Sequence, residues 1–432
     1  MRIIPKIDRE LVLPNGSRIK NRLCKAAMTE GLADAENRAT DRHVTLYRSW
    51  ARGGSGLLIT GNVQVDRRYL ERAGNIVIDG PQNAEQINGL EAVAEAGREG
   101  GAQLWMQISH AGRQTPKRIA NEPVGPSAIP LALPGGQFGQ PRALSGDEIR
   151  NVISRFAHAA SVAEQTGFEG VQVHSAHGYL LSEFLSPKVN VRDDEWGGVL
   201  KNRARLLLEC IRAVKSATGE GFAVSVKLDS ADFQQGGFAF EDCLSVIEML
   251  NQEGLDLLEI SGGTYEQPRL LEIGGLEPLY EEKVRESTRA REAYFFKYAV
   301  EARKVAKMPL MVTGGFRSRE GMEEALTEGG VDMIGLGRPL CLDAAFPGKI
   351  LSGQLEAAPD YERDLRLGPG FLGPNSSVGL IKVANGFAKL GWYYEQIYRL
   401  ADGLPADPEM SIFKALLAYE RTERTKARSL MP

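Results

Sequence analysis

The segment with the clearest chemical potential is VHSAHGYLL, residues 173–181. It contains His174 and His177, three residues apart, and Tyr179 two residues further on. Two imidazoles can donate hydrogen bonds to one oxygen atom and withdraw electron density from it, and a phenol can deliver a proton. The group therefore suits a conjugated carbonyl compound that accepts a hydride at one carbon and a proton at the next.

Two other interpretations of these histidines remain open. In one, the imidazoles only satisfy buried backbone groups. In the other, the His-x-x-His spacing ligates zinc, as in a metal-dependent barrel hydrolase, although the sequence offers no evident third ligand. The hydride interpretation needs a redox cofactor, because side chains do not supply hydride.

Two glycine-containing segments are candidates for binding the phosphate of such a cofactor: VTGGFR at 312–317 and GLGRP at 335–339. Glycines let backbone N–H groups approach a phosphate, and a basic side chain adds complementary charge. In α/β barrels the loops after the last two strands commonly bind phosphate. We therefore expect a cofactor that carries a phosphate.

Eight short, mostly apolar runs must position these groups, and helical patterns separate them. Such runs are typical of parallel strands that are buried on both faces. Eight strands that alternate with helices favour a closed (β/α)8 TIM barrel, with a doubly wound open sheet as the alternative. The runs are 23–28, 56–62, 102–109, 170–175, 223–229, 257–262, 310–315 and 333–338.

The clearest helix is predicted after Ser145, which has capping-box spacing to Glu148. Apolar residues then recur on one face until Gly167, and the next predicted strand follows at once. Two further helices are predicted over 203–217 and 241–253. Gly219 and Gly254 mark the ends of these helices, as glycines commonly do.

The alternation of strands and helices stops near residue 355. We expect one barrel domain over 1–355, then a Gly/Pro-rich linker and a helical extension over 356–432. Helices are predicted over 380–400 and 408–424, packed on the barrel or on a second subunit of a homo-oligomer. The aromatic group at 392–394 is predicted to be core, and the Arg/Lys-rich tail after Glu420 to be a solvated end.

Composition narrows the class of protein. The net charge of −4 gives no reason to expect a nucleic acid or an anionic membrane surface as a partner. No apolar run approaches the ~20 residues of a membrane span, and the N-terminus does not resemble a signal peptide. The four scattered cysteines, Cys24, Cys210, Cys243 and Cys341, predict reduced thiols in a cytoplasmic protein.

The segment GFEGVQVHSAHGYLLSEFLSPKVNVRDDEWGGVLKNRAR, residues 167–205, resembles the Old Yellow Enzyme family of FMN oxidoreductases. The segments 53–62, 107–113, 261–263 and 312–338 match family patterns in the same order, so the resemblance covers roughly residues 1–350. It implies a barrel that binds FMN and takes electrons from NAD(P)H. The implied substrates are small molecules, α,β-unsaturated carbonyl or nitro compounds whose C=C bond is reduced.

The resemblance also implies roles for individual residues. His174 and His177 would hold the substrate oxygen, Tyr179 would donate the proton, and Thr29 would hydrogen-bond the flavin ring and tune its potential. The flavin contacts implied by position are Ala27, Met28 and Thr29 on the ring, Asn62 near its pyrimidine part, Gln107 at its edge, Lys227 beside N1 and O2, and Gly314, Gly315, Gly337 and Arg338 at the phosphate.

Departures from the family pattern concern the substrate more than the flavin. Lys227 stands where arginine is usual, and Ala27 replaces a common proline. Glu30 and Gly31 lie where some relatives have an aromatic or cysteine-rich substrate wall. Clustered cysteines of iron–sulfur relatives are missing, which favours a simple ene-reductase layout. A flavin enzyme that oxidises, demethylates or isomerises its substrate and a non-catalytic flavin-binding or sensory protein remain as alternatives.

Overall fold

The computed structural model describes residues 6–131, 133, 136–262, 296–327, 330–361, 364–374 and 376–430, and only the backbone of 296–297. Gly263, at the end of one family-like segment, lies outside these ranges.

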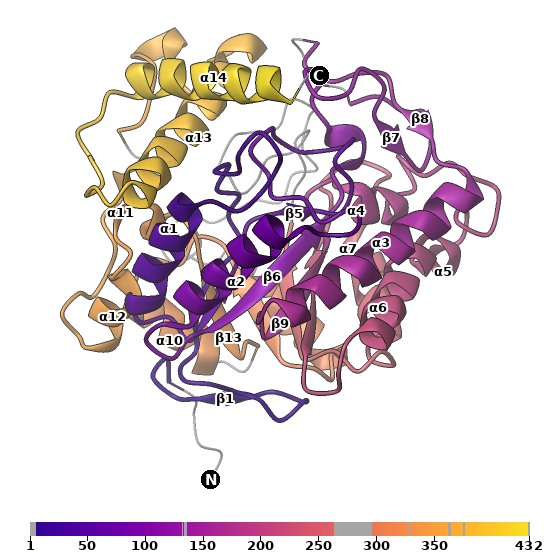
Figure 1. The fold of residues 1–432 in the computed structure, drawn as a ribbon, viewed down its shortest axis with the longest axis horizontal. Helices are drawn as coiled ribbons and strands as arrows, with labels where there is room; N and C mark the ends of the chain where they lie inside the picture. Colours follow the sequence, from indigo (N-terminus) through magenta and orange to yellow (C-terminus); the bar gives the residue numbers. More distant parts are fainter. Residues whose placement is uncertain are drawn as a thin grey trace.

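Eight parallel strands form a closed barrel (Figure 1). Each strand pairs with the next, and β13 pairs with β3 to close the ring. Each strand lies within one of the eight predicted runs, so the barrel prediction is confirmed and the open sheet is wrong. The strands are β3 (Leu23–Lys25), β4 (Leu57–Ile59), β6 (Gln103–Ser109), β9 (Gly170–Ser175), β10 (Ala223–Asp229), β11 (Leu257–Ser261), β12 (Leu310–Thr313) and β13 (Met333–Leu336).

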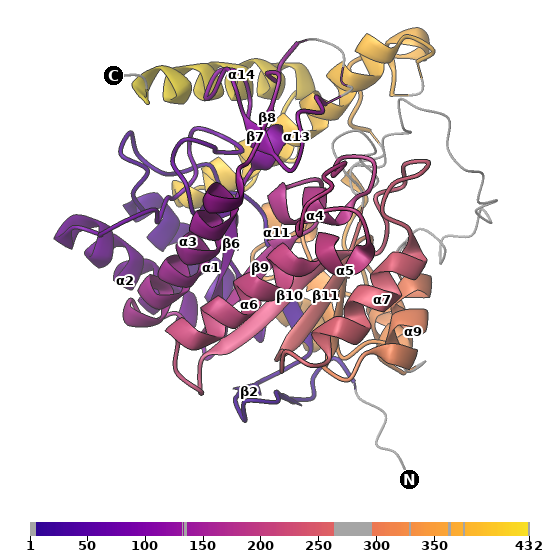
Figure 2. The ribbon, with the colours of Figure 1, turned by 90° about the vertical axis from the view of Figure 1, so that its right-hand side faces the viewer.

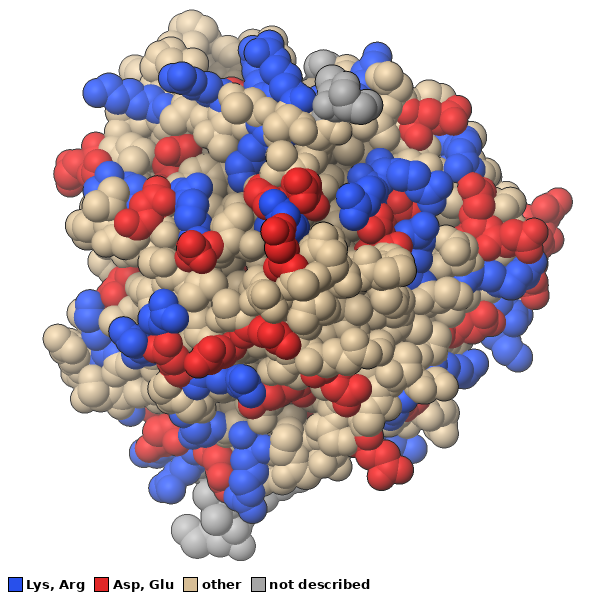
Figure 3. All heavy atoms as spheres, in the orientation of Figure 1, with Lys and Arg blue, Asp and Glu red and all other residues tan. Residues whose placement is uncertain are grey.

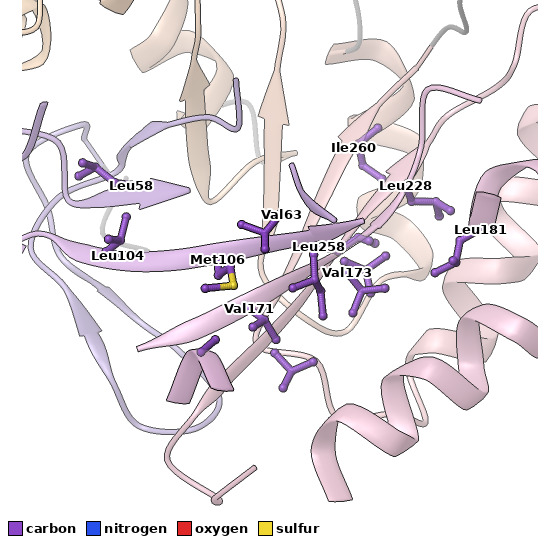
Figure 4. Packing of buried hydrophobic residues seen from close by; sticks show 14 of the residues in the cluster. Leu58, Val63, Leu104, Met106, Val171, Val173, Leu181, Leu228, Leu258 and Ile260 are labelled. Atoms are coloured by element: carbon purple, nitrogen blue, oxygen red, sulfur yellow. The ribbon is translucent and has the colours of Figure 1, made fainter. Parts of the chain in front are cut away.

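Alternate residues of the strands belong to two separate apolar clusters. One cluster lies inside the barrel and includes Trp105, Leu257 and Met311. The N-terminal hairpin of β1 (Leu11–Val12) and β2 (Arg18–Ile19) adds Leu11 and Ile19 to it. The other cluster lies between the strands and the surrounding helices, and Figure 4 shows part of it. This two-residue period decides which side chains the barrel encloses.

Helices surround the barrel, as Figures 1 and 2 show. At α3, the Ser145 N–H donates to Glu148 Oε2 at 2.8 Å, and Ser145 Oγ accepts from the Glu148 N–H at 3.2 Å, which confirms the predicted cap. The helices are α1 (Asp41–Arg52), α2 (Ala84–Arg98), α3 (Gly146–Gln165), α4 (Leu180–Leu185), α5 (Leu200–Arg203), α6 (Arg205–Ala217), α7 (Phe240–Leu250), α9 (Phe296–Val305), α10 (Arg319–Thr327), α11 (Pro339–Leu342) and α12 (Phe346–Leu351).

Three helices have boundaries that differ from their predictions, and one of them is the helix expected over 408–424, which spans Ile412–Ser429. The helix expected over 203–217 begins earlier, at Leu200, and is interrupted at Ala204 between α5 and α6. The helix expected over 241–253 ends at Leu250, and turns follow over 251–254. Short elements complete the described fold: β5 (Val63–Gln64), β7 (Val124–Gly125), β8 (Arg142–Ala143) and the 3-10 turns Gly112–Gln114 and Gly370–Leu372.

The C-terminal extension forms two long helices, α13 (Gly379–Ala401) and α14 (Ile412–Ser429). α13 packs on α1 and α11, so the extension contacts the barrel's own helices. Trp392 is fully buried and its Nε1 donates to the Met410 carbonyl at 2.9 Å, which confirms the prediction of core for this residue.

The prediction of a solvated tail after Glu420 holds only in part, because Arg421, Arg424 and Arg428 are exposed whereas one face of the helix is buried. Residues four positions apart in the second half of α14 face the protein, and Tyr419, Glu423 and Ala427 are buried. Lys426 also turns inward, and its ammonium donates to the Gly31 carbonyl at 2.6 Å. The sequence did not reveal this burial because Glu423 and Lys426 contact residues that lie hundreds of positions earlier in the chain.

Positive and negative side chains are interspersed over the face seen in Figure 3, and Lys and Arg side chains also follow its upper edge over α14. No helix among the described residues is long and apolar enough to cross a membrane. The four cysteines are buried and are not in disulfides.

One buried position in β3 is charged rather than apolar. Lys25 is fully buried, its Nζ donates to the Ile59 carbonyl at 2.7 Å, and the ammonium lies 4.3 Å from the centre of the Trp50 ring. Burial lowers the pKa of Lys25 to about 8, although the negative charge of Glu30 opposes the shift.

We therefore expect stability to depend on pH through Lys25. Between its folded pKa of about 8 and its ordinary value of 10.5, the unfolded chain binds more protons, so stability rises with pH. Urea unfolding should show the wild type gaining ~3 kcal/mol relative to Lys25→Met between pH about 7 and about 10.5. Exposed Lys304→Met is the control, and a difference that does not change with pH would contradict the expectation.

Candidate functional site

The residues predicted to form the site gather at the carboxyl end of the barrel. Since neighbouring parallel strands end at the same edge, groups far apart in sequence are brought together there. Around this edge lie Ala27, Met28 and Thr29 after β3, Asn62 after β4, Gln107 in β6, His174, His177 and Tyr179 in and after β9, Lys227 in β10, Gly314 and Gly315 after β12, and Gly337 and Arg338 after β13.

The two histidines and the tyrosine form one cluster of rings. The ring centres of His174 and His177 are 5.2 Å apart, and those of His174 and Tyr179 are 4.9 Å apart. His174 Nδ1 accepts the Ala176 N–H at 3.2 Å. A neutral His174 ring therefore carries its proton on Nε2, where it is a hydrogen-bond donor.

The backbone turns sharply to present His177. His177 has φ of 63° and Gly178 has φ of 77°, so two successive residues adopt the left-handed conformation. For a histidine this conformation is unfavourable, and the surrounding structure must stabilise it. The His177 N–H donates to both oxygens of Asp229, at 3.1 and 3.0 Å, and the ring Nε2 lies 2.8 Å from Ser261 Oγ.

Burial lowers the pKa of His174 and of His177 well below 6.5, and the positive charge of Lys227 lowers both further. Both rings are consequently neutral at neutral pH, and each has one N–H to donate. The pair can hold an oxygen atom through hydrogen bonds without adding a formal positive charge to the site.

Tyr179 belongs to a hydrogen-bonded group that the sequence did not predict. Its hydroxyl donates to Glu71 Oε2 at 2.6 Å, and Asn62 Nδ2 donates to the same oxygen. Asn62 Oδ1 is buried and has no hydrogen-bond partner in the described part of the chain, so it is available to a bound molecule. Glu71 lies in a loop, where neither periodicity nor a motif marks it.

A chain of polar side chains crosses the inside of the barrel below this group. Gln107 Nε2 donates to Gln172 Oε1 at 2.6 Å, and Gln172 Nε2 donates to Glu259 Oε2 at 2.9 Å. Lys227 Nζ lies 2.9 Å from Glu259 Oε1. The expected cation at Lys227 is thus paired with a carboxylate, which offsets much of its charge.

Gln172 and Glu259 were also missed, although the sequence holds a signal for both. Each is a polar residue two positions before another polar residue, His174 or Ser261, in an otherwise apolar run. With a two-residue period, such polar residues share the inner face of the barrel.

Glu30 connects the segment after β3 to α1 and to the loop after β4. Glu30 is buried, and it accepts the Tyr47 hydroxyl and the Gly61 N–H, the latter at 2.8 Å. A Cβ on Gly61 would lie 2.5 Å from the Thr29 Cα, so glycine at this position lets Thr29 approach. The buried Glu30 side chain therefore orders the strand-end segment from the α1 side.

The glycines after β12 and β13 have the backbone freedom or the open space that a ligand would need. Gly314 and Gly315 have positive φ, of 142° and 79°, a backbone form that glycine adopts readily. Among the described residues, a Cβ on Gly337 would meet only Met28 Sδ, at 3.6 Å. Together with the unpaired Asn62 oxygen, these features fit a ring cofactor with a phosphate. Among the described residues, no three His, Cys, Asp or Glu side chains gather as a metal site.

Comparison with known proteins gives consistent matches. The model of the NADH:flavin oxidoreductase / NADH oxidase family matches residues 13–356. NADH-dependent flavin oxidoreductase iliE of Hypocrea jecorina is 37% identical over 359 residues, which is 79% of this chain and 88% of that protein. NADPH dehydrogenase of Geobacillus sp. (strain WCH70) is 30% identical over 356 residues, 81% of this chain and 96% of that protein.

Among solved structures, the old yellow enzyme homologue from Zymomonas mobilis is similar with a TM-score of 0.68 and 25% identity. The match covers 83% of this chain and 96% of that one.

The protonation state of the histidines can be tested directly. In NMR spectra of histidine-labelled protein, the His174 and His177 rings should remain neutral well below pH 6.5, the pH near which the unfolded chain titrates. The unfolded chain therefore binds more protons as pH falls below about 6.5, and stability should decrease there. His174→Asn and His177→Asn would assign the signals, and a midpoint near 6.5 in the folded protein would refute the expectation.

Proposed function

Because the chain belongs to the NADH:flavin oxidoreductase / NADH oxidase family, that is, the Old Yellow Enzyme family, we propose that it reduces carbon–carbon double bonds activated by a carbonyl or nitro group. The observation that carries the proposal is the cluster of His174, His177 and Tyr179, with both imidazoles neutral and the phenol beside them.

The family's cofactor is FMN and its electron donor is NAD(P)H. The residues at the barrel mouth fit FMN. We assign the ring to Ala27, Met28, Thr29, Asn62, Gln107 and Lys227, and the phosphate to Gly314, Gly315, Gly337 and Arg338. When bound, FMN supplies hydride transfer, taking hydride from NAD(P)H and passing it to the second substrate.

The histidine pair binds the oxygen of the second substrate. Two neutral N–H donors stabilise the negative charge that develops on this oxygen when hydride adds to the β-carbon. Neutral rings suit this role because they remain donors over the whole physiological pH range. Asp229 and Ser261 keep the His177 ring in place through the backbone N–H and Nε2 contacts.

Tyr179 delivers the proton to the α-carbon, which completes addition of hydride and proton across the double bond. The 2.6 Å hydrogen bond to Glu71 holds the phenol oxygen in place, and the O–H turns from Glu71 toward the α-carbon when it gives up its proton. The tyrosinate left by proton transfer takes up a proton from water, which restores the phenol before the next turnover. Asn62 spreads the charge of the Glu71 carboxylate by donating to the same oxygen.

The visible spectrum of the purified protein is the first test. The protein should be yellow, bleach on anaerobic addition of NADH or NADPH, and recover its colour with 2-cyclohexenone. A yellow protein that bleaches but does not recover with enones or nitroalkenes would refute the proposed substrate class while retaining the flavin site. A colourless protein that takes up no FMN would refute both.

A substitution separates the role of Tyr179 from flavin binding. Tyr179→Phe removes the proton and leaves the ring, so we expect oxidation of the reduced enzyme by enone to slow ~100-fold, with reduction by NAD(P)H changed by less than about 2-fold. Stopped-flow measurement of the two half-reactions gives both rates. Tyr361→Phe, in the C-terminal extension, is the matched control. Equal loss in both half-reactions would exclude Tyr179 as the proton donor.

A further inference from the structure

We propose that α14 positions the proton-donating side of the site, so that the C-terminal extension serves the reaction although the family match ends at residue 356. Glu423 and Lys426 act as positioning residues for two loops of the barrel mouth. This inference rests on the proposed function. Figures 1 and 2 both show α14 lying across one end of the barrel.

The main link is a buried ion pair between α14 and the loop that contains Glu71. Glu423 is fully buried, and Arg72 Nε donates to its Oε1 at 3.1 Å. Arg118 Nη2 contacts the other carboxylate oxygen at 3.2 Å. The Arg72 guanidinium also lies 3.7 Å from the centre of the Tyr394 ring and donates from Nη2 to the Tyr398 hydroxyl at 3.0 Å.

Such a pair fixes Arg72 more firmly than a surface contact would. Both charges are out of water, so each depends on the other for compensation, and the guanidinium has donors of fixed geometry. Aromatic side chains of α13 enclose it further. Arg72 is thereby fixed to the extension and not only to its own loop.

Arg72 is connected to the site through its neighbour in the chain and through hydrogen bonds. Glu71, which accepts the Tyr179 hydroxyl, is the preceding residue. The Arg72 N–H donates to Asn75 Oδ1 at 2.9 Å, and Asn75 Nδ2 donates to the Asn62 carbonyl at 3.1 Å. Both residues that bond the same Glu71 oxygen, Tyr179 and Asn62, are therefore tied to a loop that Glu423 fixes.

A second link reaches the segment after Thr29. Lys426 Nζ donates to the carbonyls of Gly31 and Ala33, at 2.6 and 3.1 Å. A Cβ on Gly31 would lie 2.7 Å from Arg72 Cζ, so this segment also packs directly on the guanidinium. The loop with Glu71 and the segment after Thr29 thus meet beneath α14, next to the Arg72–Glu423 pair.

The variant Glu423→Gln tests the proposal because it keeps the shape and removes the charge. Glu420→Gln is the matched control, since Glu420 is on the same helix and forms a solvent-exposed pair with Arg424 at 3.6 Å. We would measure both half-reactions by stopped flow, and hydrogen exchange of the backbone amides by mass spectrometry, in wild type and both variants loaded with FMN.

In Glu423→Gln, oxidation by 2-cyclohexenone should slow about 10- to 100-fold, because a displaced donor group reacts poorly, while reduction by NAD(P)H changes less than about 2-fold. Amide exchange should rise about 10-fold or more in 61–78 and 29–33 and stay unchanged in β10. Glu420→Gln should behave like the wild type. Local exchange is a readout that does not depend on turnover.

Three outcomes would overturn the proposal: equal behaviour of the two variants, equal slowing of both half-reactions, or a rise in exchange spread over the whole barrel. If Glu423→Gln does not fold, Lys426→Met is the second variant, because it removes the second link without leaving a buried carboxylate unpaired. Faster amide exchange is then expected in 29–33. No change in exchange there would refute the inference. If the wild type does not reduce the enone, the proposed function fails, and the exchange data alone decide this inference.

Discussion

The arrangement of this protein follows from the closure of eight parallel strands into a barrel. Closure forces alternate residues of every strand inward, into a space filled by side chains. The lower part of that space is apolar, with Trp105, Leu257 and Met311 resting on the N-terminal hairpin. Two residues further along the same strands come Gln107 and Glu259, so a polar layer begins where the strands approach their carboxyl ends.

Burial of the polar side chains above the apolar layer of the barrel determines which of them are charged. With little water nearby, the charged form of each group is penalised unless a partner compensates it. Lys227 has such a partner in Glu259, whereas no carboxylate of the described residues is paired with either histidine ring, and both rings stay neutral. Neutral imidazoles at the mouth of the barrel are hydrogen-bond donors to an oxygen atom. The same burial that stabilises the fold therefore sets the protonation state on which the proposed reduction depends.

The barrel by itself does not hold every part of the site. The loops with Glu71 and Thr29 have little regular structure, and the extension supplies what steadies them. α13 contributes the aromatic side chains around Arg72, and α14 contributes the buried carboxylate of Glu423. The extension thus contacts the loops at the mouth of the barrel, although it lies beyond the family match, which ends at residue 356.

The sequence by itself determined what depends on neighbours along the chain. The eight strand runs, the Ser145 cap and the grouping of His174, His177 and Tyr179 need only local periodicity or spacing, and these predictions were close to the structure. Assignment of flavin contacts came from the family resemblance, and those roles stay predictions.

Only the tertiary structure decided the partners of the chemical groups. Tyr179 and Glu71 are 108 residues apart, and Arg72 and Glu423 are 351 apart. The inward-facing residues of the tail after Glu420 were missed for the same reason, because Glu423 and Lys426 contact loops that the sequence does not mark. Local patterns encode which face of an element is buried, whereas a hydrogen bond or ion pair between distant segments exists only once strand order and helix packing have brought them together.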